Sequence, residues 1–336
     1  MTEMAHGTVI VQSGEAVLPR WWRTVDRGTI GCVFALFAIG LLLGFAASPP
    51  LAERNGYPPF HYVTRQAFFG GAAMIGMTVV SMLPPLTLRR FAVLGFGAAF
   101  LSLLALPIFG TDFGQGAVRW YSLGFASVQP SELMGWCVIY FVAGAPIILM
   151  VSVVALAGVG GIFAYHASEH FARRIDGFLS AEVAPNTQLA YAANAIREGG
   201  FFGAGLGEGA VKWTLPDAHT DFIIAVAAEE YGVILVLIII ALFAAIAFRS
   251  FLRLLKERDP FIRLAGTGLV TMFALQAFIN TGVAVRLLPA KGMTLPFVSY
   301  GGSSIFATGL AMGMILAFTR ARPQGDLADI FSKRGR

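Results

Sequence analysis

Long apolar runs, separated by short polar or basic segments, dominate the pattern of this chain. Because about 20 apolar residues cross the hydrocarbon core of a bilayer as a helix, each long run predicts a membrane-spanning segment. A further apolar block at 133–143 is too short for a full span. The pattern therefore predicts an all-α polytopic membrane protein, a helical bundle of about eight segments. The predicted full spans are 28–47, 67–83, 91–107, 146–165, 222–248, 264–285 and 301–318.

Arginine and lysine residues gather in four segments outside the spans, and such residues mark the cytoplasmic side of a membrane protein. If the N-terminus is inside, all four clusters fall on that side, so we expect both termini to be cytoplasmic. We divide the chain into an N-terminal tail (1–27), a transmembrane domain (28–318) with an external loop at 166–221, and a C-terminal tail (319–336). The clusters are Arg20, Arg23 and Arg27; Arg89 and Arg90; Arg249, Arg253, Lys256, Arg258 and Arg263; and Arg320, Arg322, Lys333, Arg334 and Arg336.

The apolar stretch 133–165 must contain an even number of crossings, because both segments that flank it are predicted to be external. It is too short for two full helices and too long for one. The only turn signal in it is Gly-Ala-Pro at 144–146. We therefore predict a short or re-entrant descending segment, a tight inner turn and a full ascending helix.

Composition agrees with a membrane protein: 57% of the residues are hydrophobic, 13% are charged, and the mean hydropathy is +0.72. The net charge of +5 comes largely from the basic loops, so it indicates membrane orientation rather than nucleic-acid binding. Cys32 and Cys137 both lie in apolar runs, where a cysteine behaves as a small hydrophobic residue. They predict neither a disulfide framework nor a metal site.

Two polar stretches at the ends of spans carry most of the candidate chemistry: 215–222 (LPDAHTDF) and 291–304 (KGMTLPFVSYGGSS). Asp221 is the acid at the start of a long apolar run, where it suits a helix N-cap, a general base, or both. Within that run lie Glu229 and Glu230, and an acid in a spanning segment usually persists because a cavity, partner or reaction requires it. Pairing with Arg, or with polar residues such as Gln276 and Asn280 of the next span, is the structural alternative for these two acids.

A glycine-rich stretch at 199–209 precedes the first of these motifs. Its spacing resembles nucleotide-binding loops, but no predicted strand or βαβ unit surrounds it, so we reject that interpretation. We expect these glycines to let a loop lie flat at the membrane mouth, with Arg197, Lys212 and His219 facing an anionic ligand. Arg119 and Glu132 lie on the same predicted external side, where they are surface charges or part of the site.

These motifs resemble those of the SEDS family (shape, elongation, division and sporulation proteins) and occur in the same order. Their sequences are more similar to those of the division members than to those of the elongation members. The resemblance covers nearly everything after residue 20. The matching segments are 116–120 (GAVRW), 129–132 (QPSE), 173–176 (RRID), 215–222, 229–230 (EE) and 291–304.

The resemblance implies a peptidoglycan glycosyltransferase that polymerises lipid II into glycan strands during septal cell-wall synthesis in the bacterial inner membrane. The implied partners are a class B penicillin-binding protein, other divisome proteins and membrane lipids, with no nucleic acid. Asp221 takes the place of the family's essential acid. No organic cofactor is implied, and a role for a divalent cation stays open. We expect substrate contacts from Arg119, Glu132, Lys212, His219, Glu229, Lys291 and Ser299, and no metal ligands.

The chain also departs from the family pattern. The family's QPDxG segment and its two flanking half-spans are missing, which leaves eight segments where the family has ten. Two alternatives to an active polymerase stay open, and only the second follows from the missing segment. One is a flippase or transporter of lipid-linked precursors, although such a site is expected at the midplane of the membrane rather than at its surface. The other is a divisome scaffold whose catalysis is impaired by the shortened middle.

Overall fold

The computed structural model describes residues 17–109, 121–122, 127–128, 187–215, 218–288 and 292–321, with single positions between 155 and 176. These residues form a helical bundle and one two-residue antiparallel ladder that pairs Tyr121 with Val128. The elements, in chain order, are α1 (Val17–Thr24), α2 (Arg27–Arg54), α3 (His61–Met82), α4 (Pro85–Phe109), β1 (Tyr121–Ser122), β2 (Ser127–Val128), α8 (Gln188–Gly199), α9 (Val211–Thr214), α10 (Ile223–Leu254), α11 (Pro260–Ala284) and α12 (Gly302–Phe318).

Six of the predicted spans are confirmed as helices α2, α3, α4, α10, α11 and α12. Most are longer than their apolar blocks, because a helix continues beyond the hydrocarbon zone into polar residues at its ends. Three of the described helices, α2, α10 and α11, are long and apolar enough to cross a membrane, and α12 is a shorter apolar helix. The other two predicted segments, 133–143 and 146–165, fall almost entirely outside the described residues.

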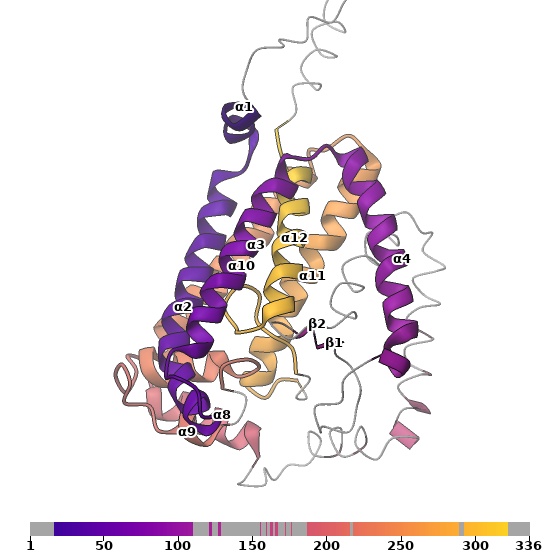
Figure 1. The fold of residues 1–336 in the computed structure, drawn as a ribbon. Helices are drawn as coiled ribbons and strands as arrows, with labels where there is room; N and C mark the ends of the chain where they lie inside the picture. The colour runs from indigo at the N-terminus through magenta and orange to yellow at the C-terminus, as the bar shows by residue number, and fades with distance from the viewer. Residues whose placement is uncertain are drawn as a thin grey trace, which may run out of the picture.

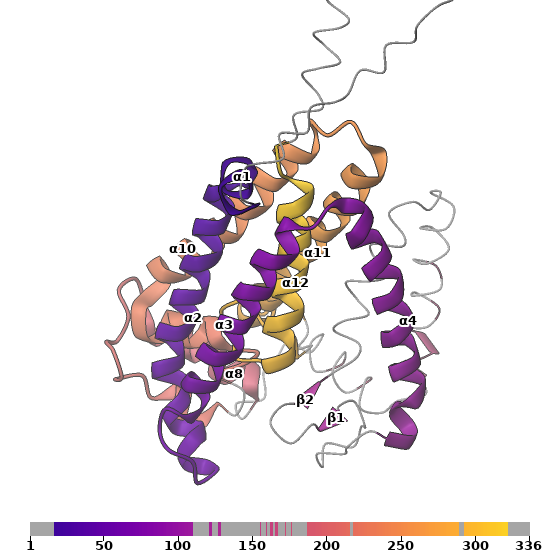
Figure 2. The ribbon, with the colours of Figure 1, turned by 45° about the horizontal axis from the view of Figure 1, so that its top comes forward.

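Helices α2, α3, α10, α11 and α12 pack side by side, whereas α4 stands apart from the other helices (Figures 1 and 2). The closest pair is α3 with α12, where small residues let two backbones approach. A Cβ added at Gly309 would lie 2.8 Å from the carbonyl oxygen of Ala73, and one at Gly313 would lie 2.7 Å from that of Met77. Small residues four apart are typical of helix contacts within membranes.

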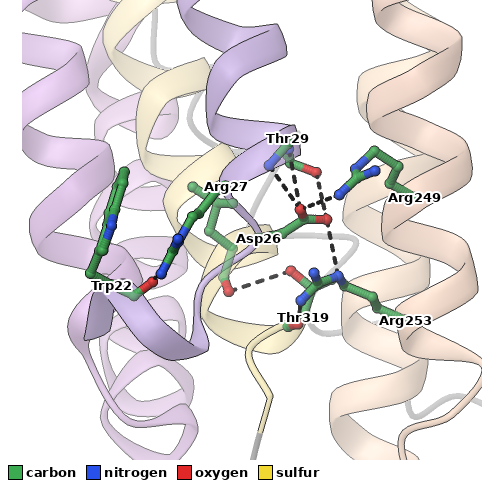
Figure 3. Close-up of polar contacts among 9 residues, drawn as sticks. Trp22, Asp26, Arg27, Thr29, Arg249, Arg253 and Thr319 are labelled. Atoms are coloured by element: carbon green, nitrogen blue, oxygen red, sulfur yellow. Dashed lines mark hydrogen bonds and ion pairs between the residues drawn. The ribbon is translucent and has the colours of Figure 1, made fainter. Parts of the chain in front are cut away.

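The described members of the four basic clusters gather at one end of the bundle, as the orientation argument predicted. Asp26, the N-cap of α2, joins two of them: its carboxylate accepts from Arg249 Nη2 at 2.6 Å and lies 3.0 Å from Arg253 Nε (Figure 3). Arg320, after α12, donates to Thr24 Oγ1 at 3.1 Å. Residues 322–336 lie outside the described chain. We refer to this region as the basic end.

Burial raises the pKa of Asp26, but the hydrogen bond from Arg249 and the charges of Arg253 and Arg249 outweigh it, so the pKa is lowered from 3.8. At neutral pH this acid is therefore ionised and offsets part of the positive charge around it.

The opposite end of the bundle holds the α2–α3 connection, helices α8 and α9, and the two candidate motifs (Figures 1 and 2). Helix α4 ends and α8 begins on this side, which agrees with an even number of crossings between them. The two passes predicted within 133–165 stay a prediction. Helices α8 and α9 were not expected, because their short, mixed sequences carry too few apolar residues to stand out from a polar loop.

Candidate active site at the end of the bundle

The two candidate motifs, far apart in the sequence, are joined by hydrogen bonds at the end opposite the basic end. Ser299 Oγ donates to the carbonyl oxygen of Thr220 at 2.5 Å and accepts from the backbone N–H of Leu295 at 2.9 Å. The backbone N–H of Tyr300 donates to the carbonyl oxygen of His219 at 3.0 Å. Ser299, predicted as a substrate contact, is only 3% exposed. The structure thus gives its hydroxyl the role of joining the two loops.

Two side-chain amides of α11 also bind these loops. Gln276 Nε2 donates to the carbonyl oxygen of Thr294 at 3.1 Å. Asn280 Nδ2 donates both to the carbonyl oxygen of Asp221, at 3.0 Å, and to that of Met293. These two amides were expected to be partners for a buried acid. That expectation is wrong: the amides bind loop carbonyls, because the loops fold back between the helices.

Asp221 lies in the turn just before α10 and is partly exposed. Helix α10 begins at Ile223, and its N-cap is Phe222, which makes no side-chain capping bond. The N-cap interpretation of Asp221 is therefore wrong. The second motif comes close to its carboxylate, since a Cβ added at Gly292 would lie 3.3 Å from Asp221 Oδ2. Gly292 has φ +65°, a conformation that favours glycine.

Aromatic rings surround His219 beside this turn. The His219 ring lies 5.7 Å from Tyr62 and 5.6 Å from Tyr300, centroid to centroid, and those two tyrosines meet edge to face at 5.3 Å. Burial raises the pKa of Tyr300, and the nearby Arg65 charge opposes this only in part. Tyr300 is thus neutral at physiological pH.

Sequence analysis missed Tyr62 at this site, and also Tyr57 and His61, whose rings stack at 4.4 Å. The available signal was the cluster of aromatic residues at the start of α3, which is typical of a span at the membrane–water boundary.

Lys212 is not the exposed cation that the sequence predicted. It is 5% exposed, forms an ion pair with Glu230 of α10, and donates to the carbonyl oxygen of Gly207 at 2.9 Å. The ion pair also corrects the expectation that Glu230 would find its partner on another span. A buried charge persists when it is paired and hydrogen-bonded, so this pair stabilises the loop against α10.

The glycine-rich loop packs into a break in α10 and does not lie flat at the mouth. At Gly232, φ is +77° and ψ is 178°, so the helical hydrogen bonding is interrupted there. The loop supplies the missing partners: Ala204 N donates to the carbonyl oxygen of Glu229 at 2.7 Å, and Val233 N donates to that of Gly200 at 3.0 Å. This packing leaves no room for side chains, since a Cβ at Gly232 would lie 2.1 Å from the carbonyl oxygen of Phe201.

Glu229 is 1% exposed and lies beneath the loop, where a Cβ at Gly209 would lie 2.7 Å from its carboxylate carbon. Among the predicted site residues that the structure describes, only the catalytic candidate Asp221 and the substrate contact His219 therefore lie at the partly exposed mouth. Arg119, Glu132 and Lys291 lie outside the described residues. Within the described ranges, no three His, Cys, Asp or Glu side chains are placed to hold a metal ion.

The chain also matches a known protein family. A family model for cell cycle proteins of the FtsW/RodA/SpoVE type matches residues 27–143 and 133–324, which together make up most of the chain. The chain belongs to this family. A protein of Caulobacter vibrioides named as a probable peptidoglycan glycosyltransferase FtsW is 38% identical over 93% of this chain and 93% of its own length.

Two solved structures share the fold of this chain. A chain from a study of polymerization and crosslinking by a peptidoglycan synthase complex superposes with a TM-score of 0.69, at 23% identity, and covers 88% of this chain and 97% of its own. A mutant of the Thermus thermophilus rod shape determining protein RodA gives a TM-score of 0.63 at 25% identity, again over 88% and 97%.

The comparisons also agree with the predicted internal shortening. The alignment with the Caulobacter protein runs over 367 residues, more than the 336 of this chain, so it contains gaps opposite residues that this chain lacks. The family model matches in two pieces that overlap at residues 133–143. This overlap lies within the stretch 133–165, which is too short for two full helices.

Proposed function

We propose that this protein is a peptidoglycan glycosyltransferase that polymerises lipid II during septal cell-wall synthesis, with Asp221 as its general base. The observation that carries the proposal is the junction of the two family motifs around the partly exposed Asp221, at the end of the bundle opposite the basic end. The name of the Caulobacter relative supports the reaction class.

The proposed reaction uses this carboxylate at the membrane surface. Asp221 takes the proton from a sugar 4-hydroxyl as the oxygen attacks the anomeric carbon of a second lipid-linked sugar, whose pyrophosphate leaves. His219, with the aromatic rings of Tyr62 and Tyr300 beside it, lines the approach to Asp221. Arg119, a predicted substrate contact, remains our candidate for stabilising the departing pyrophosphate. Lys212 is not, because its ammonium group is buried and engaged by Glu230.

A lipid-linked substrate requires the site to lie at a membrane surface. We propose that the basic end faces the cytoplasm and the site faces outward in the bacterial inner membrane, at the division septum, because basic loops mark the inner side. Single cysteines in a background without Cys32 and Cys137 test the orientation. A cysteine at Phe202, which is 83% exposed near the site, should react in whole cells with an impermeant thiol reagent. One at Lys256 should react only after lysis, and the reverse pattern would overturn the orientation.

The partner we propose is a class B penicillin-binding protein, together with other divisome proteins. The structural neighbour from a peptidoglycan synthase complex supports an assembly that couples polymerization to crosslinking. Copurification of the full chain with its candidate transpeptidase from membranes is the direct test. Failure of every such candidate to copurify would contradict the proposed partner but not the proposed polymerase activity.

Purified protein, with and without that partner, should convert fluorescent lipid II into glycan strands that a muramidase digests. Two other outcomes have distinct readouts. Transfer of lipid II across a vesicle membrane without strand formation would indicate a flippase. Normal partner binding with neither activity would indicate a scaffold, the alternative that the shortened middle favours.

A further inference from the structure

A cleft of about 630 Å³ opens at the basic end, far from the candidate active site. It lies where the α3–α4 turn, the end of α10, the start of α11 and the end of α12 meet. The polymerase proposal uses none of its residues. Its lining includes Pro85 and Ile262 and the cations Arg253, Lys256, Arg258 and Arg320.

The cleft is rich in positive charge, since these four cations face two carboxylates, those of Glu257 and Asp259. Both carboxylates also bind backbone amides. Glu257 Oε1 accepts from the N–H groups of Arg258, at 3.1 Å, and Asp259, at 3.3 Å. Asp259 Oδ1 caps α11 by accepting from Phe261 N at 2.9 Å. The acids thus shape the loop, and the lining keeps an excess of cations.

Two of the cations are fixed in place by neighbouring elements. The guanidinium of Arg320 donates to Thr24 Oγ1 at 3.1 Å and to the carbonyl oxygens of Ser81 and Met82 at 3.3 Å each. Arg253 donates to the carbonyl oxygen of Thr319 at 3.2 Å while it pairs with Asp26 (Figure 3). A preorganised guanidinium loses little conformational freedom when it binds an anion such as phosphate.

Apolar side chains accompany this charge. Leu255, next to Lys256, is 74% exposed, and Leu252, one turn earlier on α10, is 44% exposed. Cations beside exposed leucines at the end of a spanning helix match the boundary between headgroups and acyl chains. A soluble anion would gain nothing from these leucines. A phospholipid would use both features.

We propose that this cleft binds the phosphate-bearing headgroup of an anionic phospholipid from the leaflet at the basic end. Basic pockets between the ends of membrane helices are a recurrent form of lipid site. Bound there, one lipid would bridge the α3–α4 turn, the α10–α11 loop and the segment after α12. The proposal is independent of the polymerase activity.

Native mass spectrometry of the full chain, released from nanodiscs of phosphatidylcholine with a minor fraction of phosphatidylglycerol, tests it. The parent should retain one phosphatidylglycerol. The double variant Lys256→Gln/Arg258→Gln should bind it about 25-fold more weakly, at about fivefold for each basic residue. The matched control is Arg20→Gln with Arg23→Gln, two exposed cations of α1 at the same end but outside the cleft. The affinity of this control for phosphatidylglycerol should stay within about threefold of the parent's, which is a smaller change than the loss of one basic residue should cause.

Three results would overturn the site. Equal losses in both double variants would show only the general attraction of a basic surface for anionic lipid. Failure of the parent to retain any phosphatidylglycerol would exclude the lipid. Displacement of the signal by millimolar inorganic phosphate, with phosphate bound in its place, would assign the cleft to a soluble anion. Arg253 and Arg320 are left unchanged, because their loss would disturb the packing around Asp26 and Thr24.

Discussion

The side-chain amide of Asn280 donates a hydrogen bond to the backbone oxygen of Asp221 at 3.0 Å and, with the same nitrogen, to the backbone oxygen of Met293. Asn280 is 2% exposed, so both bonds are shielded from water. One buried amide of α11 therefore fixes the turn that carries the candidate base and the loop that approaches it. The position of Asp221 therefore depends on α11 as well as on α10, which follows it in the chain.

Replacement of Asn280 by Ala should move this turn and lower lipid II polymerisation about 10- to 100-fold, since small displacements of a catalytic group have large effects on rate. The matched control is Gln276→Ala, which removes an amide that binds Thr294 but not the Asp221 turn. Its loss should be smaller. Steady-state polymerisation rates at equal protein levels make the comparison, and equal losses would show that the Asp221 bond has no separate role.

The buried Lys212–Glu230 pair should behave as a unit in stability measurements. Lys212→Met leaves the Glu230 carboxylate buried without its cation, and such a loss costs about 3–5 kcal/mol of unfolding free energy. The double variant Lys212→Met/Glu230→Gln should recover part of it, because no unpaired charge remains. Glu208→Gln changes an exposed acid of the same loop and should be near neutral. Thermal unfolding in detergent measures all three, and additive losses in the double variant would refute the pairing.

The break in α10 should tolerate only glycine. Gly232 has φ +77° and ψ 178°, a region that other residues avoid at a cost of about 1–3 kcal/mol, and its Cβ would also meet the Phe201 carbonyl. Gly232→Ala should therefore lower the unfolding temperature. Gly71→Ala is the control, because nothing lies within 4 Å of its Cβ in α3. That change should be neutral or stabilise by about 0.4–1 kcal/mol. An unaffected Gly232→Ala variant would mean that the loop does not pack into the break.

The basic end should lose stability in acid through Asp26. Its pKa is lowered in the folded protein, so its ion pairs contribute full stability above 3.8 and lose it as the pH falls through the lower folded value. In the parent, the unfolding temperature should fall across this acid range more than it does in Asp26→Asn, which lacks the titrating group. Parallel curves for the two proteins between pH 6 and about pH 2 would contradict this account.

The sequence was sufficient for the six spans that the structure describes and for the gathering of the described basic residues at one end. Span length and loop charge are local properties, and α2, α10 and α11 satisfy both in full. The pairing of Lys212 with Glu230 could not be predicted, since it depends on how the glycine-rich loop folds back on α10. Likewise, Asn280 is an ordinary polar residue of a span until the loops that it binds are placed.

The glycines at 199–209 were expected to let a loop lie flat at the membrane mouth, whereas the loop packs into the break in α10. So many glycines indicate that the backbone of this loop approaches another backbone closely, as well as that the loop is flexible. Gly232, inside a predicted span, marked the place where the second backbone could be approached. Considered together, they predict a loop packed against a broken helix. Tyr62 was missed for a different reason: its role depends on His219 and Tyr300, which come from two other segments of the chain.

The measurement that tests the account most directly is polymerisation of fluorescent lipid II by the parent and by Asp221→Asn. Asparagine keeps the size of the side chain but removes its basic oxygen, so the variant should insert, fold and bind its partner normally. Its rate should fall about 10²- to 10⁴-fold, the range that a general base contributes. A variant that makes glycan strands at near the parental rate would show that Asp221 is not the base and would contradict the account.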